Sequence, residues 1–119
     1  MADETLPKSE RLCGQTAVVE LFGSGKGFSA GCLRCKVLFR DGGEPSRIVV
    51  SVPKRQFKRA VRRNLLKRRI RESYRRQKTL LGPGADVLFI YTSREVLPYE
   101  AIYADMTAAL TAISHARND

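Results

Sequence analysis

The segment from residue 54 to 78 constrains the fold more than any other part of this 119-residue chain. It holds 13 of the 22 Lys and Arg residues, and Glu72 is its one acidic residue. Leu66, Ile70 and Tyr74 recur within it at every fourth position, which is the spacing of an apolar stripe along an α-helix. The pattern predicts a basic amphipathic helix whose stripe packs on the rest of the fold.

The cations of this segment gather on the helix surface beside the apolar stripe. At about 100° per residue, one arc holds Asn64, Lys67, Arg68, Arg71 and Arg75, and a second arc holds Arg62, Arg69 and Arg76 together with Glu72. Like charges this close destabilise an isolated helix by a few tenths of a kcal/mol per pair. Because folding does not explain such an arrangement, we expect an anionic ligand.

The charge distribution narrows the class of ligand. The segment 54–78 carries a net charge of +12, whereas the remainder of the chain carries −2. Such a field on one element indicates a polyanionic partner, most commonly a nucleic acid. Nine of the 13 cations are Arg, whose forked guanidinium groups suit phosphate oxygens. A membrane surface fits less well, since the segment lacks a wide apolar face with Trp or Phe.

The other segments alternate between helical and extended patterns, and the 43% hydrophobic content is that of a globular chain. In chain order we expect a short helix at 15–22, strands at 33–39 and 47–52, the basic helix from near 57 or 60 to just before 82, a strand at 85–92 and a helix at 97–116. Residues 41–46, with sequence DGGEPS, predict a hairpin between the first two strands. The β-branched run that follows predicts a central strand.

This order predicts an α+β fold, a two-layer α/β sandwich in which helices cover one sheet. We expect a single domain over residues 12–116, preceded by a flexible N-terminus at 1–11. The chain shows no signal peptide and no apolar run long enough to span a bilayer, so we expect a cytoplasmic protein.

The three cysteines, Cys13, Cys32 and Cys35, do not predict a metal site. The pair in CLRC has the spacing of half a zinc site, but no second pair follows and the one histidine, His115, lies near the C-terminus. We interpret Cys32 and Cys35 as small apolar strand residues that face opposite sides of a sheet.

The run FKRAVRRNLLKRRIRESYR, residues 57–75, closely resembles the signature of the bacterial ribonuclease P protein family. An Ala stands three residues before an Arg-Asn pair, and a basic amphipathic helix follows. The stretches AVVELF, RIVVSVPKR and ADVLFIYTSREV are similar to that family's first helix, its strand and basic loop, and its closing half. The resemblance covers about residues 12–113. It implies a four-stranded sheet with a left-handed βαβ crossover, and therefore a short fourth strand near GFSAG at 27–31.

The resemblance also implies a function. Proteins of this family assist a catalytic RNA that removes the 5′ leader of precursor tRNA with Mg²⁺ ions, so we expect ribonuclease P RNA and precursor tRNA as partners. No protein partner, organic cofactor or catalytic residue is expected. The residues implied to bind the RNA subunit are Arg62, Arg63, Asn64, Lys67, Arg68, Arg69, Arg71 and Arg75. Those implied to bind the leader are Phe22, Lys36, Lys54 and Arg55. Asn64 is also the candidate for a metal contact at the RNA interface.

The sequence departs from the family pattern at two positions. Leu65 follows the Arg-Asn pair where the family usually has Arg, and Val18 stands where an aromatic residue is common. The second departure leaves fewer platforms for stacking a single-stranded leader, and Phe22 fits a buried core position equally well.

Two other functions stay open on the residues alone. The charge suits a general RNA-binding or ribosomal protein, and a free-standing nuclease would also bind RNA. A nuclease needs chemistry of its own, and the sequence offers one histidine, no clustered carboxylates and no nucleophile beside a base.

Overall fold

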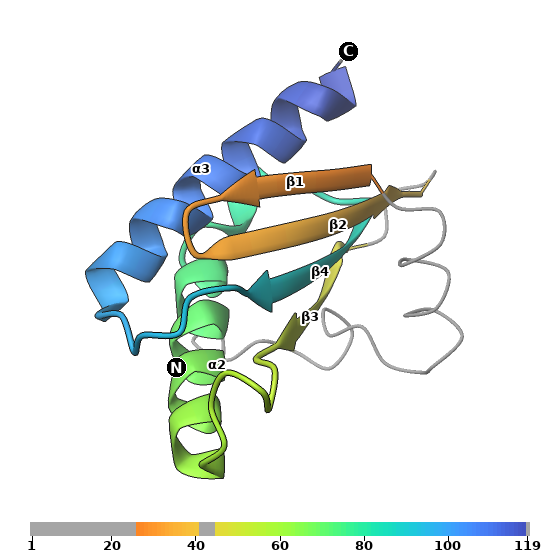
Figure 1. Ribbon diagram of the computed structural model, residues 1–119. Coiled ribbons are helices and arrows are strands. Elements are labelled where there is room, and N and C mark those ends of the chain that lie inside the picture. Colours follow the sequence, from red (N-terminus) through yellow and green to blue (C-terminus); the bar gives the residue numbers. More distant parts are fainter. Residues whose placement is uncertain (1–25, 41–44, 119) are drawn as a thin grey trace.

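The computed structural model describes residues 26–40 and 45–118, which form one sheet covered by helices (Figure 1). The elements are β1 (Lys26–Ala30), β2 (Leu33–Phe39), β3 (Arg47–Ser51), α2 (Ala60–Arg75), the 3₁₀ helix η3 (Lys78–Leu80), β4 (Ala85–Tyr91) and α3 (Tyr99–Asn118). The helix predicted at 15–22 lies outside the described residues, and with it Cys13, Val18 and Phe22. The short fourth strand expected near 27–31 is confirmed as β1.

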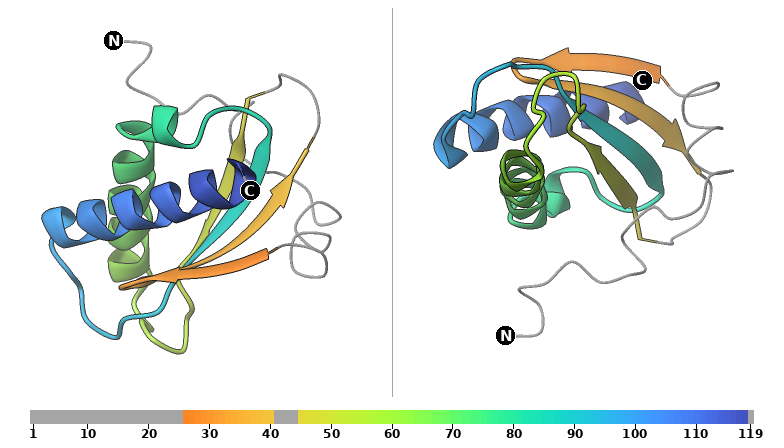
Figure 2. Two further views of the ribbon diagram at one scale, coloured as in Figure 1. Left: turned by 90° about the horizontal axis from the view of Figure 1, so that it is seen from above. Right: turned by 60° about the horizontal axis from the view of Figure 1, so that its bottom comes forward.

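The sheet has the strand order β1-β2-β4-β3. β2 pairs antiparallel with β1 and with β4, whereas β3 pairs parallel with β4. Both α2 and α3 lie on the same side of this mixed sheet and cross each other there (Figure 2). The predicted α+β architecture of one sheet and one helical layer is therefore confirmed.

The connection from β3 through α2 to β4 is a βαβ crossover of the rare hand. The two strands are parallel, and in Figure 1 both run toward the left, with β4 above β3 and α2 behind the sheet. A crossover of this arrangement is left-handed. Nearly all such units are right-handed. This feature was expected from the family resemblance, and no local pattern in the sequence predicts it.

Two expectations about the strands are wrong. β2 and β3 do not form a hairpin, because β4 lies between them in the sheet. β3 is an edge strand, and its burial alternates, with Ile48 and Val50 in the core beneath the helices. Val49 instead packs on the opposite face with Leu88. The β-branched run thus reflects apolar contacts on both faces of an edge strand. The inner strands are β2 and β4, and β4 is buried along almost its whole length.

The basic helix ends earlier than expected. α2 stops at Arg75, and the chain continues through η3 before Gly82. Gly82 and Gly84 have φ angles of 74° and 86°, a region that favours glycine, so they turn the chain into β4. Leu81 is still buried, although it reaches the core from the end of η3 rather than from α2.

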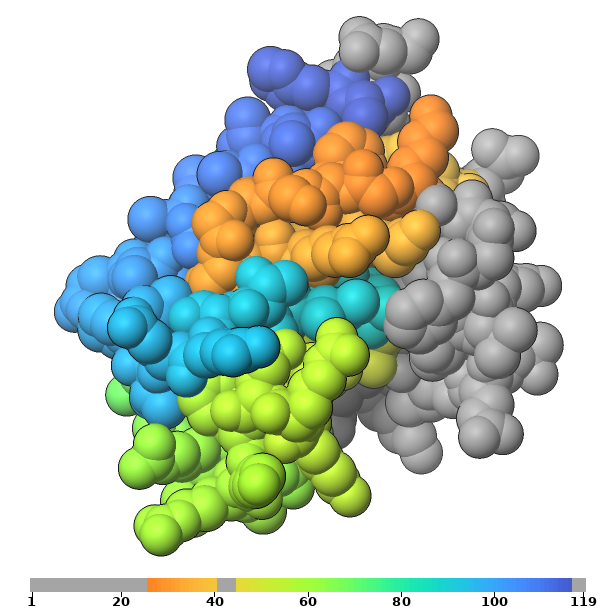
Figure 3. Space-filling view, viewed as in Figure 1, coloured from red at the N-terminus to blue at the C-terminus, as the bar shows by residue number. Residues whose placement is uncertain are grey.

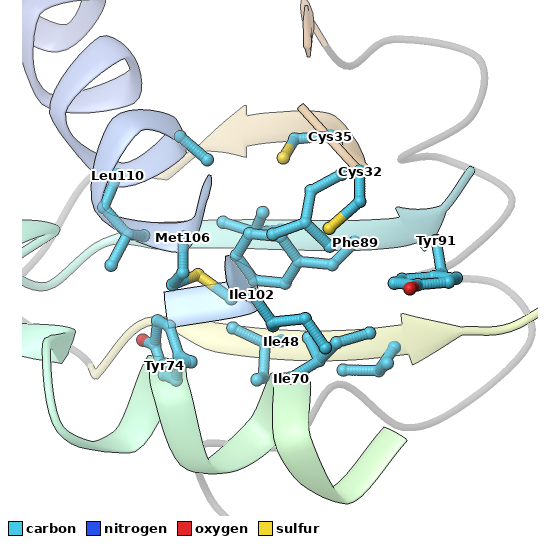
Figure 4. Packing of buried hydrophobic residues seen from close by; sticks show 14 of the residues in the cluster. Cys32, Cys35, Ile48, Ile70, Tyr74, Phe89, Tyr91, Ile102, Met106 and Leu110 are labelled. Carbon is cyan, nitrogen blue, oxygen red and sulfur yellow. The ribbon is translucent and has the colours of Figure 1, made fainter. Parts of the chain in front are cut away.

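The main core fills the space between the sheet and the two helices (Figure 4). α2 contributes the predicted stripe of Leu66, Ile70 and Tyr74, all at most 1% exposed. α3 contributes Ile102, Met106, Ala109, Leu110 and Ile113, which are fully buried, whereas Ala101 on the same helix is half-buried. The two helical periodicities are confirmed.

Cys32 and Cys35 both face this core, so the expectation that they face opposite sides is wrong. Cys32 lies in the turn before β2, where Gly31 has a φ angle of 56° and breaks the strand alternation. The N–H of Cys32 donates to Asp105 Oδ2 on α3 at 2.9 Å. Burial raises the pKa of each thiol to about 12, so both stay protonated and act as small apolar groups.

Candidate nucleic-acid interface

The outer side of α2 presents the predicted cations to solvent. Arg62, Asn64, Arg68 and Arg71 are exposed, and Lys67 is half-buried. None of these five side chains makes a hydrogen bond or ion pair within the described part of the chain. The buried stripe on the inner side fixes the rotation of the helix, so its cations are held outward on a rigid element.

Three further predicted cations are engaged within the protein. Arg63 Nη1 donates to the carbonyl oxygens of Phe57 and Lys58, at 2.7 and 2.9 Å. Arg69 Nη1 donates to the carbonyl oxygen of Leu97 at 2.5 Å and so ties α2 to the segment before α3. The Arg75 side chain is 10% exposed and forms a bidentate pair with Glu72. These three arginines hold α2 and its neighbouring segments in place, and they contribute less solvent-exposed charge than the cations on the outer side of the helix.

Glu72 is compensated from two sides. Its carboxylate accepts from Arg75 and from Arg76 Nε, the latter at 2.9 Å. The guanidinium groups of Arg75 and Arg76 lower the pKa of Glu72 from 4.5 to about 2. The single acid of α2 is therefore already paired near the C-terminal end of the helix, and the cations nearer its N-terminal end have no acid on the helix to pair with.

The loop before α2 carries Lys54 and Arg55, both exposed. This loop is anchored by Gln56, whose Nε2 donates to the carbonyl oxygens of Tyr91 and Ser93 at 3.1 and 2.8 Å. Phe57 is buried, with its ring centroid 5.9 Å from that of Tyr91. The two predicted leader-binding cations thus project from a loop that is fixed to the end of β4.

The sheet face turned away from α2 and α3 holds the third described leader candidate, Lys36. It pairs across strands with Leu88, and next to this pair Arg34 lies opposite Ile90. Leu38, Leu88, Ile90 and Val49 form a small apolar cluster on this face. Register places Arg34 level with Ser51, the last residue of β3, toward the end of the sheet where the 53–59 loop leaves it. Arg34 was not among the predicted site residues, although the alternation of β2 places it on the same face as Lys36.

The predicted residues therefore fall into two groups. The RNA-subunit candidates lie on α2, on one side of the sheet, whereas Lys36 lies on the other, and the loop with Lys54 and Arg55 connects the two. Asp86 is on the same face as Lys36, where it accepts from Arg47 and Arg40. Phe22 cannot be placed in either group because it lies outside the described residues.

The described residues contain neither a metal-binding cluster nor a membrane-spanning helix. Within 26–40 and 45–118, no group of three or more His, Cys, Asp or Glu side chains is arranged to hold a metal ion. Over the same ranges, no helix has the length and apolar character needed to cross a bilayer. The expectation that Mg²⁺ belongs to an RNA partner stays a prediction.

Comparisons with known proteins agree on one family. The family model described as Ribonuclease P matches residues 6–114. A ribonuclease P protein component from Porphyromonas gingivalis is 37% identical over 92% of this chain and 86% of its own length. One from a Picosynechococcus species is 33% identical over 76% of this chain and 78% of its own length.

Solved structures show the same fold. The ribonuclease P protein from Thermotoga maritima superposes with a TM-score of 0.77 at 24% identity, covering 87% of this chain and 97% of that one. The Staphylococcus aureus protein also gives 0.77, at 20% identity, covering 88% of this chain and 95% of that one.

Proposed function

This chain belongs to the ribonuclease P protein family, and from that premise we propose that it is the protein subunit of a ribonucleoprotein that removes the 5′ leader of precursor tRNA. The protein binds the catalytic RNA through α2 and the leader through the open sheet face and the 53–59 loop. The RNA carries out the hydrolysis. The protein acts in the cytoplasm, where its tRNA substrates are made.

One observation carries the proposal most directly: α2 holds exposed cations that have no partner among the described residues. Arg62, Arg68 and Arg71 lie outward on a helix whose only acid is already paired. Phosphates of a structured RNA would compensate these charges, and each guanidinium group can donate two parallel hydrogen bonds to a phosphate. The fixed rotation of α2 supports docking in one orientation.

A single-stranded leader suits the opposite face of the sheet. Arg34 and Lys36 stand beside the apolar cluster around Leu88, and Lys54 and Arg55 extend the positive charge along the loop. Cations that follow the backbone and apolar groups that meet the bases allow binding without reading a sequence. This fits a subunit that must accept the leaders of many different tRNAs.

The Mg²⁺ ions that cleavage requires would be held by RNA. The described part of the interface offers cations and the amide of Asn64 in place of a carboxylate cluster, and hard divalent ions prefer oxygen ligands with negative charge. The contribution of the protein is to hold the RNA subunit and substrate together and to screen phosphate repulsion between them. Asn64, exposed on α2, stays the candidate for a contact to an RNA-bound metal ion.

Cleavage of precursor tRNA tests the proposal against its alternatives. At near-physiological salt and low Mg²⁺, a bacterial ribonuclease P RNA is assayed with and without the purified protein. We expect correct 5′ cleavage with both components, slow cleavage by the RNA alone, and none by the protein alone. Tight RNA binding without stimulation would favour a general RNA-binding protein, and cleavage by RNA-free protein would identify a nuclease.

A further inference from the structure

Two adjoining hollows lie where the 53–59 loop and the start of α2 meet the chain after β4. The first, of about 280 Å³, is lined by Gln56, Phe57, Lys58, Arg59, Arg62 and Arg94. The second, of about 330 Å³, is lined by Arg55, Gln56, Thr92 and Arg94. Gln56 and Arg94 belong to both, so the hollows share a wall. Figure 3 shows the cyan residues that follow β4 directly beside the yellow-green residues that precede α2.

The linings are strongly and uniformly positive. Five of the lining residues are cations, namely Arg55, Lys58, Arg59, Arg62 and Arg94, and no acidic residue lines either hollow. Glu95 follows Arg94 in the chain but is not part of either lining. Arg94 lies 32 residues beyond Arg62 and outside the signature at 57–75. It therefore adds a cation that no linear motif predicts.

This convergence is held in place by hydrogen bonds on both sides. Gln56 Nε2 links the loop to the carbonyl oxygens of Tyr91 and Ser93. The hydroxyl of Tyr91 donates to the carbonyl oxygen of Glu95 at 2.7 Å and accepts from the N–H of Leu97 at 3.2 Å, which fixes the path of the chain around Arg94. Arg63 holds the loop carbonyl oxygens of Phe57 and Lys58. These hydrogen bonds fix the backbone that carries the cations, and so keep the cations close together despite their mutual repulsion.

The chemistry of the linings selects an anion with several acceptor oxygens. Each hollow is many times the roughly 30 Å³ that one water occupies, so a phosphate group with its waters fits. The first turn of α2 contains no acidic residue, and the N-cap Arg59 makes no side-chain capping bond, so the positive end of the helix adds to the field of the arginines.

We propose that Arg94, with Arg59 and Arg62, binds a single phosphodiester group of an RNA backbone at this junction. The inference rests on the proposed function and extends it: Arg94 is a phosphate ligand supplied by the segment after β4. The phosphate belongs either to the RNA subunit or to precursor tRNA, since the junction lies between the α2 surface and the loop of Lys54 and Arg55. The chemistry is the same in both cases, and the test separates the two sources.

The first test compares Arg94→Gln with Lys26→Gln in the full-length protein. Both remove one charge from an exposed side chain, and Lys26 lies on β1, at the opposite edge of the sheet. Two dissociation constants are measured over a range of KCl concentrations: protein with ribonuclease P RNA, and holoenzyme with precursor tRNA. We expect Arg94→Gln to weaken one of them about tenfold and to flatten its log–log salt slope by about one unit.

The outcomes separate this inference from the proposed function. If Arg94→Gln weakens binding of the protein to ribonuclease P RNA, the phosphate belongs to the RNA subunit. If it weakens binding of the holoenzyme to precursor tRNA, the phosphate belongs to precursor tRNA. If Arg94→Gln matches Lys26→Gln in both while the wild-type protein still supports cleavage, the site is overturned and the proposed function stands. If the wild-type protein neither binds the RNA nor stimulates it, the proposed function itself fails.

A double-mutant cycle shows whether Arg94 and Arg62 share one phosphate. Arg94→Gln and Arg62→Gln are combined and compared with Arg94→Gln combined with Arg71→Gln, because Arg71 lies about 13 Å farther along α2. Groups that bind one phosphate show non-additive losses, whereas distant sites add. We expect coupling with Arg62 and additivity with Arg71. Additive losses in both cycles would mean a general positive field and would overturn the site.

Discussion

Two groups of arginines in this protein stand in opposite electrostatic situations. On the sheet, Arg40 and Arg47 converge on Asp86, with Arg47 bidentate at 3.0 and 2.8 Å and Arg40 at 3.0 Å. On α2, Arg62, Arg68 and Arg71 are exposed and have no acidic partner among the described residues. Asp86 compensates the two arginines on the sheet, whereas these three arginines of α2 meet neither a carboxylate nor a carbonyl oxygen among the described residues, which indicates that a ligand compensates them.

Removing Asp86 tests the structural half of this comparison and should have the largest effect on stability. Asp86 is 4% exposed, whereas the side chains of Arg40 and Arg47 are 21% and 34% exposed. Breaking a buried pair costs about 3–5 kcal/mol, and because the arginines retain some hydration we expect about 2–3 kcal/mol for Asp86→Asn. Urea denaturation measures the loss. A change below about 0.5 kcal/mol, the range of ordinary surface substitutions, would mean that this cluster is not structural.

Replacing Glu72 tests the intermediate case, an acid on α2 that already has two cations. Its pKa of about 2 lies below the ordinary 4.5, so its stabilising effect is present above pH 4.5 and is lost as the pH falls toward 2. At pH 7 we expect Glu72→Gln to cost less than about 1 kcal/mol, because the pair is partly solvated.

The pH dependence gives the sharper readout for Glu72. Denaturation of both proteins between pH 5 and 2 should show a stability difference that shrinks as the pH falls, since the wild-type carboxylate becomes protonated there. A difference that stays constant over this range would show that the pairs with Arg75 and Arg76 contribute nothing. Cys32 and Cys35 do not complicate the profile, because burial raises the pKa of each thiol to about 12.

Much of the fold could be predicted from periodicity. Leu66, Ile70 and Tyr74 form a stripe on α2, and buried residues alternate along β2. Each pattern reflects burial on one side of a regular element, which the local sequence predicts. The local sequence does not predict which strands pair. The Gly-rich sequence after β2 predicted a hairpin, but tertiary packing inserted β4 between β2 and β3. Likewise, the apolar run of β3 reflects packing on both faces of the sheet, although β3 is an edge strand.

The candidate site shows the same division. A helical wheel predicted which cations face outward, and Arg62, Arg68 and Arg71 do. It could not show that Arg69 would meet the Leu97 carbonyl oxygen, because that acceptor comes from a distant loop. Arg94 was missed for the same reason. It lies in an irregular segment, whose sequence has no periodic pattern from which its spatial neighbours could be predicted.

The salt dependence of RNA binding tests the central claim most directly. Arg68→Gln combined with Arg71→Gln is compared with Lys26→Glu, which lowers the net charge by the same two units far from α2. For ribonuclease P RNA, we predict that the α2 variant weakens binding and flattens the slope of log K against log salt by about one to two units, while the control keeps the wild-type slope. An unchanged slope for the α2 variant, or equal flattening in the control, would contradict the claim that α2 docks the RNA.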